Sequence, residues 1–91
     1  MFSVTREITF CYGHRILGHA GKCRHLHGHN GRVAVTLEAE SLDALGMVAD
    51  FGTIKDTVGK WIAERLDHRM ILKRGDPALP ALEALGEPVV A

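Results

Sequence analysis

The chain has 91 residues, of which 46% are hydrophobic and 24% charged, and 11 basic residues balance 11 acidic ones. This length predicts a single domain over residues 1–91 with a modest core, and the zero formal charge leaves no electrostatic footprint for nucleic acid or an anionic membrane. No apolar run is long enough to span a bilayer and two cysteines are too few for a disulfide framework, so we expect a cytoplasmic protein with free thiols.

Two segments alternate apolar and polar residues, as half-buried strands do. In residues 2–12 the apolar positions are mostly even-numbered, and Arg6 is the one break in that series. In residues 31–40 the apolar positions are odd-numbered, and an irregular stretch marked by glycines separates the two segments. Because a loop joins them, we expect the two strands to pair antiparallel.

A helix is predicted to open at Thr53, because Thr53 and Asp56 have the spacing of a capping box. The apolar positions that follow have helical spacing and form one stripe, made of Ile54, Val58, Trp61, Ile62 and Leu66. We expect Trp61 to pack in the core against the sheet. Farther along the chain, residues 70–72 are predicted to be extended and residues 81–85 to form a helical turn.

Five of the six histidines lie within sixteen positions of one another. His14 continues the even-numbered apolar series of the first strand, while His27 and His29 extend the odd-numbered series of the second. In an antiparallel pair the end of the first strand lies beside the start of the second, so the three imidazoles should meet at one end of the apolar face. His19 and His25 stand outside this pattern and are expected at the surface.

Three imidazole nitrogens are typical of a catalytic zinc site, since a site with three protein ligands leaves a fourth position for water or substrate. The sequence therefore predicts a Zn²⁺ ion held by His14, His27 and His29. The alternative is that these histidines are solvated or hydrogen-bonded individually.

Two further groups of residues have chemistry that the sequence leaves open. Cationic neighbours favour the thiolate form of Cys23, which could act as a base or nucleophile, close the zinc site as a fourth ligand, or be inert. Cys11 has the parity opposite to its apolar neighbours and is interpreted as a structural or surface residue. Asp67 either orients the His68 imidazole for proton transfer, or His68 simply lies near the negative end of the helix dipole.

Four motifs are distributed through nearly all of residues 2–72. They are FCYGHR at 10–15, CRHLHGHN at 23–30, VADF at 48–51 and LDH at 66–68. This combination resembles the 6-pyruvoyl-tetrahydropterin synthase family, and within it the bacterial 6-carboxy-tetrahydropterin synthases of queuosine biosynthesis.

The resemblance implies an α+β tunnelling fold, in which an antiparallel sheet carries helices on one face and subunits join their sheets into a barrel. A homo-oligomer with sites near the subunit interfaces is therefore expected. The family also has a later helix and a strand bearing a glutamate that anchors the pterin, so we expect the domain, residues 1–91, to be C-terminally incomplete relative to the family.

The resemblance also implies roles for the site residues. It places zinc on His14, His27 and His29, in agreement with the parity argument, and makes Cys23, Asp67 and His68 the proton-transfer set. In such a site zinc binds the substrate's side-chain hydroxyls and eases removal of their carbon-bound protons, a Lewis-acid role.

The activity implied is that of a zinc-dependent lyase converting 7,8-dihydroneopterin triphosphate to 6-carboxy-5,6,7,8-tetrahydropterin in queuosine biosynthesis. Three alternatives stay open: 6-pyruvoyl-tetrahydropterin synthase activity, a non-catalytic zinc-binding oligomerisation module, and hydrolysis at an open three-histidine zinc. The expected partners are the small pterin triphosphate and further copies of the chain, with neither nucleic acid nor a membrane among them.

Overall fold

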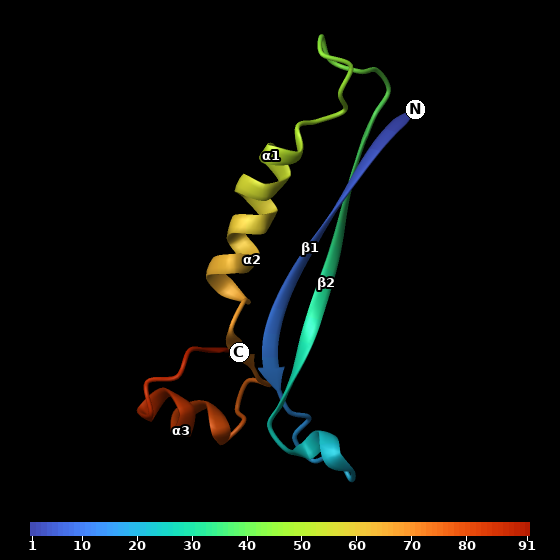
Figure 1. Cartoon of the computed structure of the whole chain (residues 1–91). Coiled ribbons are helices and arrows are strands. Elements are labelled where there is room, and N and C mark those ends of the chain that lie inside the picture. Colours follow the sequence, from blue (N-terminus) through green and yellow to red (C-terminus); the bar gives the residue numbers. More distant parts are fainter.

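The computed structural model describes residues 1–91, and its dominant feature is a long two-stranded antiparallel ribbon (Figure 1). Strand β1 spans Phe2–His14 and strand β2 spans His27–Ala39. Both predicted strands are thus present, although β2 begins at His27 rather than at residue 31. The register pairs Phe2 with Ala39 and His14 with His27, which confirms the predicted antiparallel pairing.

The complete sheet is mixed, which corrects the prediction of an antiparallel sheet. Strand β3, Arg69–Ile71, pairs parallel with β1, and β4, Val89–Val90, pairs parallel with β3, in the order β2-β1-β3-β4. The chain returns from the far end of the ribbon in a helical segment, and the strand that follows runs in the direction of β1 (Figure 1). Helix α3, Ala78–Ala84, then connects β3 to β4, as a parallel pair requires a crossover.

The helical segment beside the ribbon consists of α1, Phe51–Ile54, a π turn η2, Lys55–Gly59, and α2, Lys60–Arg65. The predicted opening at Thr53 is wrong, because Asp50 caps the helix. The Asp50 carboxylate accepts a hydrogen bond from the Gly52 N–H at 2.7 Å, satisfying one of the backbone donors that a helix leaves free at its start.

The prediction that Trp61 packs in the core is also wrong, since this residue is 51% exposed. A π turn is wider than an α turn, so the residues that follow it are rotated relative to an uninterrupted α-helical stripe. Ile54 and Ile62 remain buried, whereas Trp61 turns to the outer surface. There the Arg65 guanidinium lies 5.7 Å from the ring centroid, within the range of a cation–π contact.

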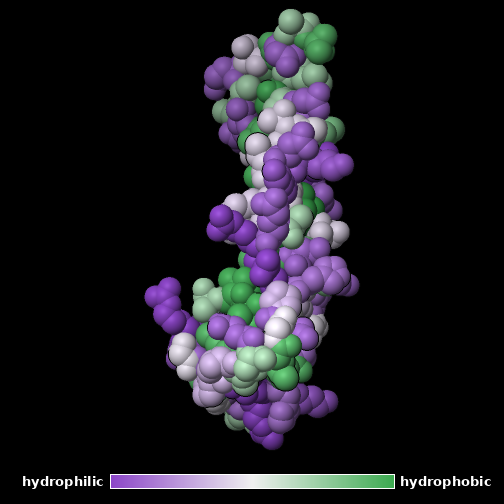
Figure 2. Space-filling view, turned by 90° about the vertical axis from the view of Figure 1, so that its left-hand side faces the viewer, coloured by the Kyte–Doolittle hydropathy of each residue, from purple (hydrophilic) through white to green (hydrophobic).

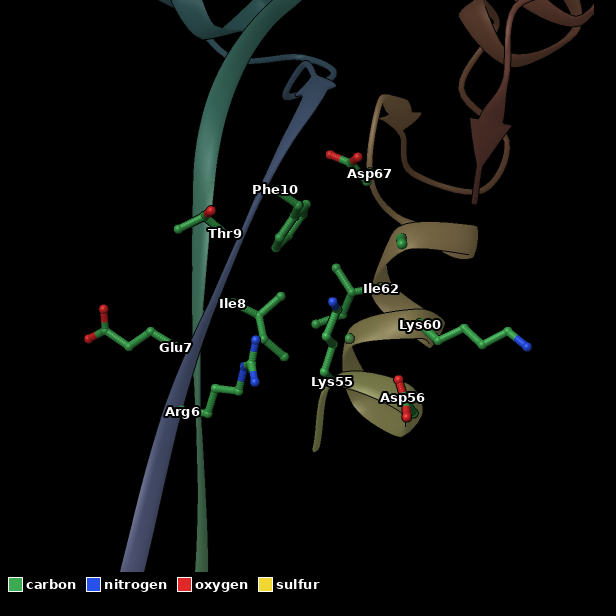
Figure 3. Close-up of a pocket in the computed structure, with 12 residues that line it drawn as sticks. Arg6, Glu7, Ile8, Thr9, Phe10, Lys55, Asp56, Lys60, Ile62 and Asp67 are labelled. Carbon is green, nitrogen blue, oxygen red and sulfur yellow. The ribbon is translucent and has the colours of Figure 1, made fainter. Parts of the chain in front are cut away.

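The apolar face of the ribbon packs against the helical segment. Figure 3 shows Ile8 pointing toward Ile62, while Glu7 points to the opposite side of the strand. Arg6, the break in the apolar series, also points toward the helix, where its Nη1 donates a hydrogen bond to the Phe51 carbonyl at 3.0 Å. A polar side chain on the inner face is therefore satisfied by the backbone at the start of the helix.

Only a small core is fully enclosed. Ile54, Ile62 and Leu72 are its buried apolar residues, and Asp76 is the buried polar one. The radius of gyration is 17.7 Å, whereas a compact domain of this length should have about 12 Å. Figure 2 shows apolar residues exposed both at the upper end and in the lower half of this face, with hydrophilic residues between them. The elongated chain therefore leaves much apolar surface open.

An ion pair between the buried Asp76 and the partly exposed Arg15 links the loop after β1 to the loop before α3. Arg15 donates from Nε to Asp76 Oδ2 at 2.9 Å and from Nη2 to Asp76 Oδ1, while the Ala78 N–H also reaches Oδ1, at 2.8 Å. The Arg15 guanidinium lowers the pKa of the Asp76 carboxyl to about 2. Because Arg15 directly follows His14, this pair fixes the backbone next to that histidine.

The helices of the structure are too short or too polar to span a bilayer.

Candidate functional site

Three imidazoles meet at the end of the ribbon where β1 stops and β2 starts. The register places His14 opposite His27 and Tyr12 opposite His29. The ring centroids are 4.5 Å apart for His14 and His27, and 4.8 Å apart for each of the other two pairs. One ring nitrogen from each of the three histidines lies within 4.8 Å of the others. The predicted convergence of these side chains is therefore present.

His14 is the innermost of the three. Its Nε2 atom is buried and has no hydrogen-bond partner in the chain, although buried polar atoms are nearly always paired. Burial is the main cause that lowers the pKa of His14, followed by the nearby His27 and His29. The lowered pKa favours the neutral imidazole, which is the form that binds metal.

His27 is held in the tautomer that leaves its outer nitrogen available. Its Nδ1 lies 2.7 Å from the His25 carbonyl oxygen, and because a carbonyl only accepts, Nδ1 must carry the proton. Nε2 then keeps its lone pair. A backbone carbonyl bound to the second nitrogen is the usual support of a metal-ligating histidine. The side chain of His25 itself is exposed, as is that of His19, which confirms the surface position predicted for both.

These donors fit a zinc ion. Three imidazole nitrogens form the ligand set of an open catalytic site. A metal ion would also supply the partner that the buried Nε2 of His14 lacks. His29 is exposed, so the outer side of the group remains accessible to a further ligand.

Asp67 and His68 lie at the opposite edge of β1, where β3 begins. The His68 N–H donates to the Cys11 carbonyl at 2.7 Å, and the Cys11 N–H donates to Asp67 Oδ1 at 3.0 Å. Asp67 Oδ2 lies 2.9 Å from His68 Nδ1. His68 adopts a left-handed backbone with φ of 59°, which lets the ring fold back toward the carboxylate that precedes it in the chain.

The Asp67 carboxylate is held in its charged form. The hydrogen bond from the Cys11 backbone is the largest cause that lowers the pKa of Asp67, and the bond with His68 is the next. A charged carboxylate beside Nδ1 favours the proton on that nitrogen and leaves Nε2 of His68 as the acceptor. The His68 side chain is 77% exposed, so this acceptor is available to a bound molecule.

The thiol beside this pair is that of Cys11. Its Sγ lies 3.4 Å from His68 Nε2 and 3.8 Å from Asp67 Oδ1, whereas Cys23 lies in the short helix η1, Lys22–Arg24, and belongs to neither group of potential ligands. The sequence interpretation of Cys11 as a structural or surface residue missed this placement. Its parity was the available signal, because it puts Cys11 on the face opposite to His14, but the pairing of β3 with β1 was not predicted.

Several open cavities border these groups. One, of about 480 Å³, lies between β1 and the helical segment and contains none of the three histidines, although Asp67 lies at one end of it (Figure 3). Another, of about 420 Å³, is lined by Cys11, His27 and His68, and a smaller one, of about 250 Å³, is lined by Cys11 and His29. The last two cavities therefore each border both groups of candidate ligands.

Several known proteins are similar to this chain. A 6-carboxy-5,6,7,8-tetrahydropterin synthase from Rickettsia bellii is 50% identical over 76 residues, covering 84% of this chain and 55% of the relative. One from Haemophilus influenzae is 35% identical, covering 78% and 52%, and a probable one from Halobacterium salinarum is 38% identical, covering 90% and 51%. The chain thus spans about half the length of the curated relatives it matches.

The fold and the sequence profile agree with these relatives. The crystal structure of an uncharacterised protein from Wolinella succinogenes superposes with a TM-score of 0.72 at 40% identity, covering 89% of this chain and 49% of the other. The profile of the family described as 6-pyruvoyl tetrahydropterin synthase matches residues 3–90. Because that match takes in both strands of the ribbon, the three histidines and the Asp67–His68 pair, the chain belongs to the 6-pyruvoyl tetrahydropterin synthase family.

Proposed function

We propose that the protein is a zinc-dependent lyase that converts 7,8-dihydroneopterin triphosphate to 6-carboxy-5,6,7,8-tetrahydropterin, in the cytoplasm and as a step of queuosine biosynthesis. The observation that carries the proposal is the meeting of His14, His27 and His29, with a buried and unpartnered Nε2 on His14. The names of the curated relatives support the carboxylated product, and the open outer side of the histidine group supports a small-molecule ligand.

The proposed reaction balances without an external oxidant or reductant. The first two side-chain carbons are oxidised as they become the carboxyl group and the aldehyde carbon. Two of the electrons released reduce the dihydropterin ring, and two reduce the third carbon, which loses triphosphate and becomes the methyl group of acetaldehyde. Water supplies the additional oxygen. The bond between the first and second side-chain carbons breaks, triphosphate leaves, and the two remaining carbons depart as acetaldehyde. The protein therefore has to move protons and hold the side chain, which are tasks for imidazole and carboxylate groups.

In this proposal His14, His27 and His29 would hold zinc, which as a Lewis acid would make the substrate hydroxyls more acidic. Asp67 keeps the proton of His68 on Nδ1, so that Nε2 accepts a proton from the substrate carbon. The half-buried thiol of Cys23, flanked by Lys22 and Arg24, is proposed as the second proton-transfer group.

The proposed lyase is also a homo-oligomer with sites near its subunit interfaces. The support is physical: only three apolar residues are buried, so most apolar side chains remain accessible to a partner, and β2 presents a 13-residue edge without a partner strand. An open edge of this length pairs readily with another chain. We expect sedimentation velocity to find a species larger than the 9.9 kDa monomer, and a Val35→Pro change on β2 to shift it toward monomer. A wild-type chain that sediments as a monomer at micromolar concentration would contradict this.

The activity itself is tested with zinc-loaded protein and 7,8-dihydroneopterin triphosphate, with products identified by mass. We expect 6-carboxy-5,6,7,8-tetrahydropterin, and we expect Asp67→Asn to lower its rate of formation by about 100-fold, since general acid–base groups contribute roughly 10²–10⁴-fold. The zinc affinity of the three-histidine site in this variant should equal that of wild type, because Asp67 is not one of its ligands. A pyruvoyl product would redirect the proposal within the family. The absence of any pterin product above that of Asp67→Asn would instead leave a zinc-binding oligomerisation module as the better account.

A further inference from the structure

A second group of potential metal ligands lies beside the histidine site but does not share its residues. Cys11, Asp67 and His68 each offer one ligand atom, and the three atoms lie within 4.8 Å of one another. Cys11 and His14 have opposite parity on β1, so their side chains point to opposite faces of the strand. The two groups are therefore separate sites.

We propose that Cys11, Asp67 and His68 form a second site, specific for a thiophilic divalent ion such as Zn²⁺. A thiolate, an imidazole and a carboxylate are all zinc ligands, and at zinc bond lengths a tetrahedral arrangement sets neighbouring ligand atoms about 3.3–3.6 Å apart. Cys11 Sγ lies 3.4 Å from His68 Nε2 and 3.8 Å from Asp67 Oδ1. The sulfur also lies 3.6 Å from His68 Nδ1, so an ion on Nε2 would require the exposed His68 ring to turn until its lone pair points at the thiol.

The ligands are held in place by bonds that the ion would not use. The backbone N–H and carbonyl of Cys11 bind Asp67 and the His68 N–H, which fixes the three residues relative to one another. The 2.9 Å contact between Asp67 Oδ2 and His68 Nδ1 keeps these two side chains together, and the thiol lies beside both ring nitrogens, at 3.4 Å from Nε2 and 3.6 Å from Nδ1. A carboxylate on the second ring nitrogen is the usual support of a ligating histidine.

Access and charge also suit a divalent cation. Cys11 and His68 line the open cavity of about 420 Å³, together with Glu87, so an ion has a path from solvent. One thiolate and one carboxylate offset the two positive charges of the ion. Water completes the coordination on the open side.

Occupancy of this site has a consequence that rests on the proposed function. An ion on His68 Nε2 removes the lone pair that accepts the substrate proton, so metal in excess of the histidine site should inhibit the lyase. This inhibition depends on the thiol of Cys11, because Asp67 and His68 alone offer too few ligands to hold zinc tightly.

Cobalt(II) alone is the probe, because a thiolate bound to it produces a sulfur-to-cobalt charge-transfer band in the near ultraviolet. Wild-type chain should bind a second equivalent of Co²⁺ with this band. In Cys11→Ala the band and the second equivalent should disappear, while in the matched thiol variant Cys23→Ala both should persist. In His27→Ala, which disables only the histidine site, one equivalent of Co²⁺ should still bind and should show the band. Circular dichroism checks that Cys11→Ala stays folded, and alanine retains both backbone bonds.

The outcomes separate the site from the activity. A band lost in Cys23→Ala but kept in Cys11→Ala, or a wild-type chain that binds one equivalent without the band, overturns the second site. If the lyase assay fails while the band behaves as expected, the site stands and the proposed function falls. If both hold, excess zinc should inhibit wild type but not Cys11→Ala. Equal inhibition of the two proteins would overturn the inhibitory role.

Discussion

Replacing His27 with alanine is expected to weaken zinc binding by more than about 100-fold. Loss of a residue that only hydrogen-bonds to a metal ligand already weakens metal binding by roughly 10–100-fold, and His27 is itself a proposed ligand. His27 supplies one of only three nitrogens in the histidine group, and its ring is held with Nε2 free by the His25 carbonyl. With only two imidazole ligands, water would fill the other coordination positions of the ion, so tight binding is lost. Competition with a coloured chelator at neutral pH measures the affinity.

The matched control is His25→Ala. The His25 side chain is exposed and its contribution to the site is the backbone carbonyl, which alanine retains. Its zinc affinity should equal that of wild type. Because Cys11, Asp67 and His68 are a second candidate site, the titrations are done in a Cys11→Ala background. Tight zinc retained by His27→Ala in that background would remove the three-histidine site from consideration.

The second large effect is expected on stability. Asp76→Asn should lower the melting temperature by about 10 °C, because removing one partner of a buried ion pair leaves the other charge uncompensated. Asp76 is 1% exposed and Arg15 donates to both of its carboxylate oxygens. Glu7→Gln is the control: it breaks the exposed pair with Arg32, whose closest atoms are 3.9 Å apart. That change should move the melting temperature by less than about 4 °C.

The Arg15–Asp76 pair also predicts that the folded protein loses stability at acid pH. The folded-state pKa of Asp76 is lowered to about 2 from the usual 3.8, so folding favours the charged form. The stability it contributes is complete above about pH 4 and is lost as the pH falls through 2. Wild type should therefore lose more melting temperature between pH 4 and pH 2 than Asp76→Asn does. Parallel curves for the two proteins would show that the pair does not govern acid stability.

The ribbon and the histidine group could be predicted because their cause is local. Side chains on a strand alternate between two faces, so the parity of His14, His27 and His29 is set once the two segments are strands. Antiparallel pairing across a short loop then brings the end of one beside the start of the other. The observed pairing of His14 with His27 agrees with these two facts, whereas the exact register also depends on the loop between the strands.

The helix shows where local reasoning stops. Thr53 and Asp50 both have side chains that cap helices, and the choice of Asp50 depends on how the chain approaches the ribbon. The orientation of Trp61 depends on the π turn at Lys55–Gly59. Periodicity assumes an uninterrupted α-helix, and one wide turn is enough to rotate Trp61 out of the stripe.

What the sequence by itself determined is therefore the pair of strands, the face that each histidine takes, and the family resemblance that the profile match confirms. Only the tertiary structure decided that β3 joins the free edge of β1 in parallel, and with it that the thiol beside His68 is that of Cys11. The physical reason is distance along the chain. Alternation acts between adjacent residues, whereas the contact of Cys11 with His68 depends on where a helical segment returns the chain after more than fifty residues.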